Sequence, residues 1–236
     1  METRINKYLS QSGYCSRRQA DKLIEEKRVT IDGKIAVMGD KVSDLQKVCV
    51  DGSIIDNNEK EVLLAFYKPV GIVCTTTDKQ GDNNIVDYIG YEQRIYPVGR
   101  LDKDSEGLIL MTNNGEITDK ILRAANGHEK EYIVKVDKKI NEDFIRKMSE
   151  GVYIKELDVT TRKCFVQKQS DKAFRIILTQ GLNRQIRRMC ETLGYKVTHL
   201  KRIRIMNILL GDLKEGEYRE LEKEEYNKLI KDLYKE

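Results

Sequence analysis

The chain has 236 residues, of which 39% are hydrophobic and 35% are charged. This length predicts one large domain or two modest ones, with enough apolar residues for a core. The net charge is only +4, so the protein as a whole is not a polycation. No run of about eighteen apolar residues occurs, and the N-terminal residues are polar, so we expect no membrane span and no secretion signal. These features predict a cytoplasmic protein with no membrane partner.

Positive charge is nevertheless concentrated in one segment. Residues 184–204 carry seven Arg or Lys against the single acidic Glu191, whereas residues 212–236 carry nine acidic and six basic side chains. A local basic segment is typical of proteins that bind a polyanion, but a solvated helix face has the same composition. Charge alone leaves both interpretations open.

Cysteine and histidine residues give no metal pattern. The five cysteines are widely spaced and form no C-x-x-C pair, so neither a zinc knuckle nor a redox pair is predicted. We expect them to be small thiols in a reducing cytosol. His128 and His199 are far apart, and we assign them structural or RNA-contacting roles rather than metal binding.

Residues 3–56 are predicted to form a small α/β module, followed by a polar linker at 57–61. Ser16 and Gln19 have the spacing of a capping box and predict the start of a helix. The pairs at 32–33 and 51–52 are both Asp-Gly and predict tight hairpin turns. Basic side chains gather near the start of the predicted helix: Arg17, Arg18 and Lys22.

Residues 62–236 are predicted to form a second domain. Apolar runs predict strands near 62–67, 72–74, 95–98, 108–111, 132–136, 174–179 and 196–200. They predict helices near 116–124, after a cap at Asn141, from a cap at Asn183 to about Leu193, and at the C-terminus. Strands outnumber helices and hairpin signals recur. We therefore predict an α+β fold with a mixed, mainly antiparallel sheet.

A loop around Asp102 is the strongest candidate for chemistry. Gly99 and Gly107 bracket this single carboxylate, Arg100 precedes it by two residues, and a continuous apolar run follows. A shaped loop between two strands is a common position for a functional group. Asp102 is a candidate nucleophile, although most Asp residues in such loops only cap their own backbone. We expect Asp104 to shape the loop.

Two further segments supply candidate partners. Arg187 is a candidate counter-ion for the carboxylate, and Arg184 lies three residues earlier on the same predicted helix face. Ile186 is nearer the opposite side and is expected to pack inward. Tyr132 starts a predicted strand, where a tyrosine is usually half-buried packing but could instead stack on an extruded base.

Together these segments resemble a known family. Residues 68–71 (Lys-Pro-Val-Gly), 99–102 (Gly-Arg-Leu-Asp), 129–132 (Glu-Lys-Glu-Tyr) and 181–189 resemble, in order, the motifs of the bacterial ribosomal RNA pseudouridine synthases of the RsuA family. Residues 4–33 resemble an S4 RNA-binding domain. Among the subtypes, residues 101–105, 187–191 and 202–207 are most similar to the large-subunit synthase of the F type.

The resemblance implies an isomerase that converts uridine to pseudouridine in RNA without a cofactor or metal. It implies that Asp102 is the nucleophile, that Tyr132 stacks on the uracil and takes the C5 proton, and that Arg187 pairs with Asp102. Arg100 would assist base extrusion, and Leu101 and Ile186 would pack beside the site.

The resemblance also implies RNA as the partner of a monomeric protein. The substrate would be a uridine in a 23S ribosomal RNA hairpin near the peptidyl-transferase region, with another rRNA site or a tRNA anticodon stem-loop as the alternative. Basic side chains expected to hold RNA are Arg17, Arg18, Lys22, Arg100, Arg184, Arg188, Lys201, Arg202 and Arg204.

Two rivals lie outside this activity. A non-catalytic, ribosome-associated S4 protein would explain the basic segment but not a full set of catalytic motifs in order. An S4-bearing methyltransferase would need a Gly-rich cofactor loop after a strand, and the sequence has none.

Overall fold

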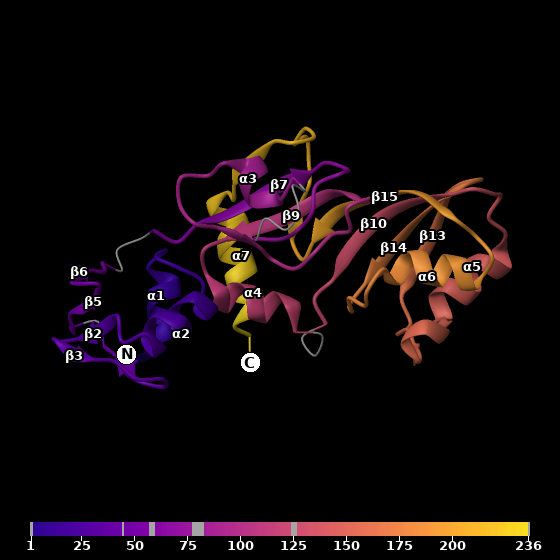
Figure 1. The fold of residues 1–236 in the computed structure, drawn as a ribbon. Coiled ribbons are helices and arrows are strands. Elements are labelled where there is room, and N and C mark those ends of the chain that lie inside the picture. The colour runs from indigo at the N-terminus through magenta and orange to yellow at the C-terminus, as the bar shows by residue number, and fades with distance from the viewer. Residues whose placement is uncertain (1, 44, 57–59, 77–82, 124–126, 236) are drawn as a thin grey trace. The chain divides into compact units, whose positions relative to one another are not determined.

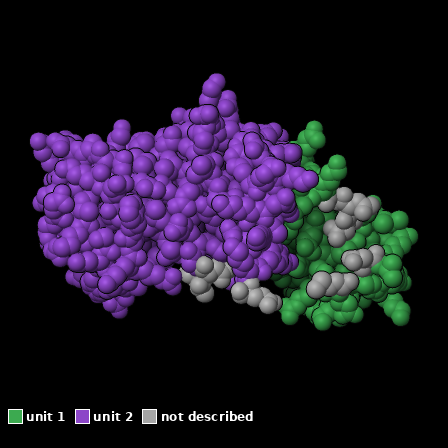
Figure 2. All heavy atoms as spheres, turned by 180° about the vertical axis from the view of Figure 1, so that it is seen from behind, with its two compact units in different colours: residues 1–62, 92–94, 113–115 green, residues 63–91, 95–112, 116–236 purple. Residues whose placement is uncertain are grey.

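The computed structural model describes residues 2–43, 45–56, 60–76, 83–123 and 127–235. The chain divides into two compact units, which Figure 2 colours separately: residues 1–62 with 92–94 and 113–115, and the remainder. Residues 57–59 of the predicted linker lie outside the described residues. Within the described ranges, no helix is both long and apolar enough to cross a bilayer.

The first unit contains two helices and short strands around a small core. Its elements are β1 (Thr3–Arg4), α1 (Ile5–Gln11), α2 (Arg17–Glu25), β2 (Val29–Ile31), β3 (Lys34–Ile35), β4 (Lys41–Val42), β5 (Val48–Val50) and β6 (Ser53–Ile54). The predicted capping box is present, because Ser16 and Gln19 each accept a hydrogen bond from the other's backbone N–H. Both Asp-Gly pairs form hairpin turns with positive φ, as predicted. Apolar residues of both helices and of the strands pack together in one cluster.

The second unit is built on one nine-stranded sheet, ordered β13-β14-β10-β15-β9-β7-β17, with β16 beside β15 and β8 beside β9. Its strands are β7 (Leu63–Lys68), β8 (Tyr96–Pro97), β9 (Glu106–Thr112), β10 (Lys130–Val136), β13 (Phe165–Ser170), β14 (Ala173–Leu178), β15 (Val197–Ile205), β16 (Ile208–Leu209) and β17 (Tyr218–Glu220). The β9–β15 pair is parallel, and the other pairs of this sheet are antiparallel. The predicted α+β fold with a mixed, mainly antiparallel sheet is confirmed.

Helices cover this sheet in two places. They are α3 (Ile85–Ile89), α4 (Gly115–Leu122), α5 (Glu142–Glu150), α6 (Gln185–Thr192) and α7 (Lys223–Leu233), with a 3-10 turn at Lys155–Leu157 and a small β11–β12 pair (Tyr153–Ile154, Val159–Thr160). Figure 1 shows α5 and α6 beside β13, β14 and β10, and α4 and α7 beside β9.

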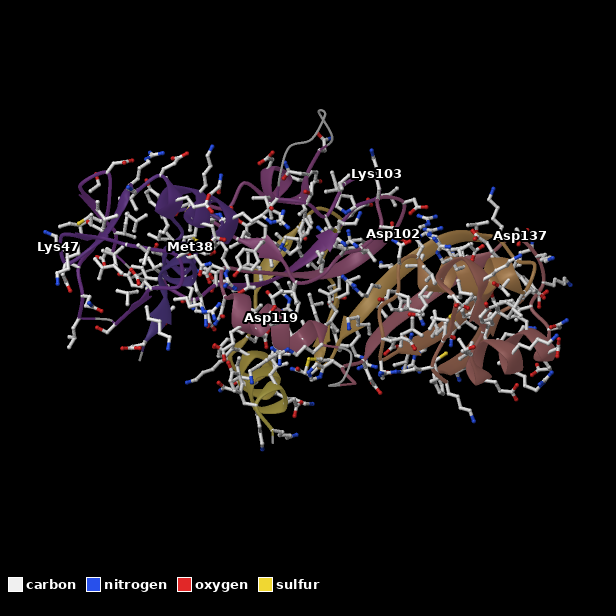
Figure 3. The ribbon with its side chains drawn as sticks, turned by 60° about the horizontal axis from the view of Figure 1, so that its bottom comes forward. Met38, Lys47, Asp102, Lys103, Asp119 and Asp137 are labelled. Carbon is white, nitrogen blue, oxygen red and sulfur yellow. The ribbon has the colours of Figure 1, made fainter. Side chains whose placement is uncertain are left out.

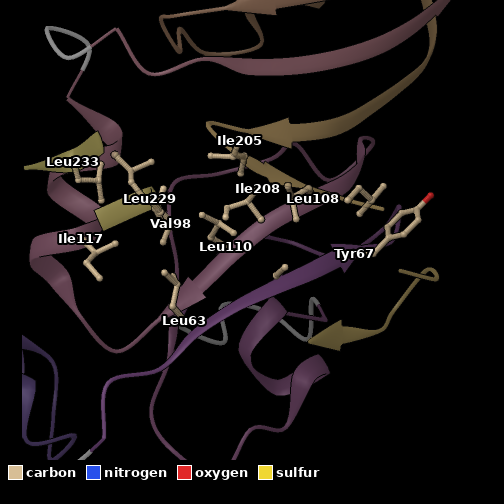
Figure 4. Packing of buried hydrophobic residues seen from close by; sticks show 13 residues of the cluster. Leu63, Tyr67, Val98, Leu108, Leu110, Ile117, Ile205, Ile208, Leu229 and Leu233 are labelled. Carbon is tan, nitrogen blue, oxygen red and sulfur yellow. The ribbon is translucent and has the colours of Figure 1, made fainter. Parts of the chain in front are cut away.

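The central strands are apolar on both faces because both faces are covered. On one face, Leu63 and Leu110 pack with Ile117 of α4 and Leu229 of α7, as Figure 4 shows. On the other face of β7, the Phe66 ring lies against Tyr88 of α3. All six residues of β7 are buried, which explains a continuous apolar run in place of an alternating one.

One predicted strand and one predicted helix cap are wrong. Residues 72–74 form no strand, only an isolated bridge from Val73 to Asn84, and the Cys74 thiol instead bonds the backbone of Leu101. The helix predicted to be capped by Asn183 begins at Gln185, with Arg184 at the cap position in the left-handed conformation (φ 51°). At both positions, contacts with the loop before β9 override the local sequence pattern: Cys74 bonds to Leu101, and Arg184 bonds to Asp104.

The junction of β9 with β15 depends on a glycine. Gly107 has a φ of 108°, and a Cβ there would lie 2.2 Å from the Arg202 carbonyl oxygen and 2.7 Å from the Arg202 nitrogen. Gly107 is the register partner of Arg202, so the two backbones approach closely at this point. Any other residue must shift one of these strands.

We predict that Gly107→Ala lowers the free energy of unfolding by about 3 kcal/mol, because it adds backbone strain and a clash with buried backbone. Urea unfolding measures this change. Gly181→Ala is the matched control, since Gly181 has no positive φ and no atom near its Cβ position, and it should change stability by less than about 0.5 kcal/mol. Equal stability of the two variants would contradict the close approach of the β9 and β15 backbones at Gly107.

Candidate active site

The loop before β9 forms part of the wall of a cleft of about 920 Å³. Figure 3 labels Asp102 and Lys103 on this loop. The other walls come from α6 with the segment before it, from β10 and from β15. Three segments far apart in the sequence therefore meet around Asp102. The predicted site residues that line the cleft are Arg100, Leu101, Asp102, Tyr132, Arg184, Ile186, Arg187 and Arg202.

Two arginines face the Asp102 carboxylate. The Arg184 Nη1 and Arg187 Nε atoms each lie 3.8 Å from Asp102 Oδ2. These distances bring opposite charges together but are too long for hydrogen bonds. The Asp102 side chain remains one-third exposed to the cleft. Its negative charge is therefore stabilised while its oxygens stay accessible to a substrate.

Arg187 also shapes the loop that carries Asp102. Its Nη2 atom donates to the Asp104 carbonyl oxygen at 2.8 Å and to Ser105 Oγ at 3.0 Å. Arg187 and Ser105 are both buried. Among the described residues, Arg187 Nε has no hydrogen-bond acceptor, although it is buried and lies on the Asp102 side. One guanidinium thus holds the loop with one nitrogen and presents another to the carboxylate.

Arg184 and Asp104 form the outer part of this charge cluster. Arg184 donates from Nη1 and Nη2 to the two Asp104 carboxylate oxygens at 3.3 and 3.4 Å. The neighbouring arginines lower the pKa of Asp104 against the opposing effect of burial. The Asp104 side chain faces Arg184, Arg187 and the solvent. The left-handed backbone at Arg184 is uncommon for a residue with a Cβ and is often found at functional sites.

The apolar side of the cleft comes from residues that flank these charges. Tyr132 is buried on β10, directly across from Arg202 of β15. Ile186 and Leu101 are also buried and line the cleft. A planar base that enters the cleft would therefore meet one aromatic ring and two aliphatic side chains beside the carboxylate.

Lys68 holds the turn that follows β7. This fully buried lysine ends β7 and donates to the carbonyl oxygens of Pro69 (2.7 Å) and Ile72 (2.9 Å). Burial, reinforced by the positive charge of Arg202, lowers its pKa against the raising effects of Cys74 and Asp102. In the sequence, residues 68–71 stand out only as part of the family motifs. A lysine at the end of an otherwise apolar strand is the signal that could have found it.

The basic side chains predicted to hold RNA lie in different environments. Arg17, Arg18 and Lys22 are exposed on α2, and Arg100 is exposed at the cleft. Arg188 donates to the Asn183 carbonyl oxygen and pairs with Glu156, and the Lys201 ammonium lies over the Tyr67 ring.

Arg202 and Arg204 differ from the expectation of a surface patch. Arg202 is 3% exposed and donates to the Leu108 carbonyl oxygen at 2.6 Å, so it is part of the cleft wall. Arg204 pairs with Glu131 and Glu129 and is largely neutralised. Residues two apart on a regular strand share a face, but β15 has a bulge between Arg202 and Arg204. Arg202 pairs with Tyr132 and Arg204 pairs with Glu131, which are consecutive residues of β10. The two arginines therefore lie on opposite faces of the sheet.

The two histidines are separated in the structure as well. His128 lines the cleft, and its Nε2 atom is buried without a hydrogen-bond partner among the described residues. His199 Nε2 lies 3.2 Å from Glu106, which also accepts a hydrogen bond from Tyr67.

Comparison with known proteins agrees with this geometry. A family profile described as RNA pseudouridylate synthase matches residues 62–192, and an S4 domain profile matches residues 3–43. The chain belongs to the RNA pseudouridylate synthase family. It is therefore an isomerase that carries an N-terminal S4 domain, and the resemblance to the RsuA-type ribosomal synthases is confirmed.

Individual relatives extend over almost the whole chain. It is 54% identical to the dual-specificity RNA pseudouridine synthase RluF of Salmonella typhi, over 97% of this chain and 79% of the relative. It is 33% identical to the ribosomal large subunit pseudouridine synthase B of Bacillus subtilis, over 96% and 95%. A crystal structure of a pseudouridylate synthase matches 96% of this chain and 99% of its own, with a TM-score of 0.71 and 27% identity.

An ion cluster on the opposite face of β10 from Tyr132 predicts acid sensitivity. Buried Glu131 accepts hydrogen bonds from Arg175 and Arg204, and these lower its pKa below the ordinary 4.5. The carboxylate therefore stabilises the fold above this pH, and the contribution is lost as the pH falls through the lowered pKa.

We predict that Glu131→Gln lowers the free energy of unfolding by roughly 2 kcal/mol at neutral pH, since two charge-assisted hydrogen bonds are weakened. The difference from the unsubstituted protein should be fully present above the ordinary pKa of 4.5 and should shrink as the pH falls below it in urea unfolding. Glu150→Gln, on an exposed position of α5, is the control and should show neither effect. A difference that does not depend on pH would contradict the assignment.

Proposed function

We propose that this protein converts a uridine of 23S ribosomal RNA, in a hairpin near the peptidyl-transferase region, to pseudouridine, with Asp102 as the nucleophile. The observation that carries the proposal is the position of the Asp102 carboxylate in a cleft of about 920 Å³, wide enough to admit a nucleotide, with Arg184 and Arg187 beside it. The names of two relatives support ribosomal RNA as the substrate. One relative is a ribosomal large subunit pseudouridine synthase, and the other is described as a dual-specificity RNA pseudouridine synthase. A second RNA, such as a tRNA anticodon stem-loop, is the alternative substrate.

The reaction requires three events at one nucleotide. The uridine leaves its stack, the C1′–N1 bond breaks, and C5 of the same uracil bonds to C1′. In the proposed reaction Asp102 either attacks C1′, forming a bond that breaks when C5 displaces the carboxylate, or assists release of the uracil without bonding to C1′. Arg187 balances the charge of Asp102. C5 loses its proton after the new bond forms, while N1 gains one, so that product and substrate are isomers.

The remaining side chains would position the base. Tyr132 would stack on the extruded uracil and accept the C5 proton, and Ile186 and Leu101 would exclude water beside it. Arg100, exposed at the cleft, would fill the gap left in the RNA or bind a phosphate. The proposed reaction uses no cofactor and no metal.

We predict that Asp102→Asn reduces pseudouridine formation by roughly 10⁴-fold or more, because an amide is not a nucleophile. Carbodiimide mapping of pseudouridines in large-subunit rRNA and in tRNA treated with each protein gives both the activity and the target. RNA affinity should be retained. Asp104→Asn, in the same loop, is the matched control and should keep measurable activity. Continued conversion by the Asp102 variant would remove Asp102 as the nucleophile.

The S4 domain is proposed to bind RNA through α2. Replacing Arg17, Arg18 and Lys22 together by Gln should weaken binding to an rRNA transcript and reduce the slope of log affinity against log salt by about 0.7–0.9 for each phosphate that is no longer bound. Filter binding over a series of salt concentrations measures both quantities. Unchanged affinity and slope would show that this helix does not contact RNA. Lys41→Gln, outside α2, serves as the control.

A further inference from the structure

The inner wall of the cleft carries positive charge that no carboxylate of the described residues balances. Lys130 of β10 and Arg202 of β15 both line the cleft. Among the described residues, neither forms an ion pair with a carboxylate. The nearby acidic groups Asp102 and Asp104 are engaged by Arg184 and Arg187. The positive charges of Lys130 and Arg202 are therefore free to attract an anionic ligand, whereas the charges of Arg184 and Arg187 on α6 are already balanced.

Arg202 is held rigidly with one nitrogen unused. Its Nε atom donates to the Leu108 carbonyl oxygen, and its Nη2 atom is buried without a hydrogen-bond partner among the described residues. A buried N–H group without an acceptor is costly, and such groups are rare unless a ligand or water completes them. A guanidinium that is 3% exposed and fixed by the sheet cannot turn away to solvent.

Lys130 lies on the same face of β10 as Tyr132, two residues away, because side chains alternate along a strand. Arg202 is the register partner of Tyr132 on β15, so Tyr132 neighbours both cations: Arg202 across the strand pair and Lys130 along β10. A base stacked on the Tyr132 ring would therefore have its edge beside Lys130 and Arg202. A backbone phosphate at the mouth would instead meet the exposed Arg100 and Arg184.

We propose that Lys130 and Arg202 form an anion-binding wall that stabilises the negative charge on the uracil ring while its bond to the ribose is broken. This inference rests on the proposed function. When the C1′–N1 bond breaks, its electron pair remains on the uracil and is shared between N1 and the carbonyl oxygens. Fixed N–H donors and a positive charge at the ring edge lower the energy of that anion more than the energy of the neutral base. C5 then donates a pair to C1′ and displaces the Asp102 oxygen where that oxygen has bonded to C1′; the C5 proton departs, and N1 is protonated.

The surroundings of Lys130 make its charge sensitive to pH. Burial, and second the positive charge of Arg202, lower its pKa to about 8. His128, which also lines the cleft, has its pKa lowered by burial and by the charge of Lys130. The other titratable or charged residues that line the cleft are Cys74, Tyr96, Arg100, Asp102, Lys103, Arg123, Tyr132, Arg184 and Arg187. The ammonium should therefore be charged at neutral pH and lose its charge as the pH rises through about 8.

The test measures single-turnover release of tritium from C5-labelled uridine in the RNA that the mapping experiment identifies. Lys130→Gln should lower the rate at neutral pH by about 100-fold, the size expected when one donor to a developing anion is removed, with RNA Kd changed less than about threefold. Lys130→Arg should retain most of the rate at neutral pH. Above about pH 8 the rate of the unsubstituted enzyme should fall, whereas the rate with arginine should not.

Lys135→Gln and Lys135→Arg are the matched controls, because Lys135 is exposed on the same strand and faces away from the cleft. Both should behave as the unsubstituted enzyme. An unchanged rate for Lys130→Gln, an equal alkaline fall with arginine, or an effect confined to Kd would each overturn the anion-binding wall. The last result would assign Lys130 to a phosphate. None of these outcomes affects Asp102, whose role is tested separately by its own variant.

Discussion

The parallel contact between β9 and β15 positions the whole candidate site. It joins Glu106 and Gly107 to Lys201 and Arg202, and among the described strands it is the one parallel pair of this sheet. The loop that carries Asp102 ends at this contact. Because β15 also pairs with β10, the same contact brings the loop to the strand that carries Tyr132. Only a glycine at position 107 lets the two backbones approach so closely.

Charge is arranged in two separate sets around the cleft. On one side, Arg184 and Arg187 face Asp102 and Asp104, and the four groups compensate one another. The second set consists of Lys130 and Arg202, which line the cleft and have no carboxylate partner within the described part of the chain. Separation of this kind fits a reaction in which a nucleophile must keep its negative charge while a leaving group develops one. In both sets the charged groups are held in place before the reaction begins, so they need not reorganise to stabilise a negative charge.

Structure was predicted most reliably where the sequence pattern involves only neighbouring residues. The capping box at Ser16 and the Asp-Gly turns form as predicted, because their hydrogen bonds and φ values involve only neighbouring residues. Prediction failed where a segment distant in the sequence supplies the hydrogen-bond partner instead. The Cys74 region bonds the loop at Leu101 in place of a strand partner, and Arg184 takes a left-handed conformation with its side chain directed at Asp104.

Apolar periodicity and ordered motifs are local to the chain, so the fold class, the family and the candidate carboxylate could all be predicted from the residues. Which basic residues can reach a ligand depends instead on how the strands pair. A single-residue bulge in β15 separates Arg202 from Arg204, turning one into the cleft wall and pairing the other with Glu131. Strand register depends on neighbouring strands, so no pattern within 184–204 could reveal that division.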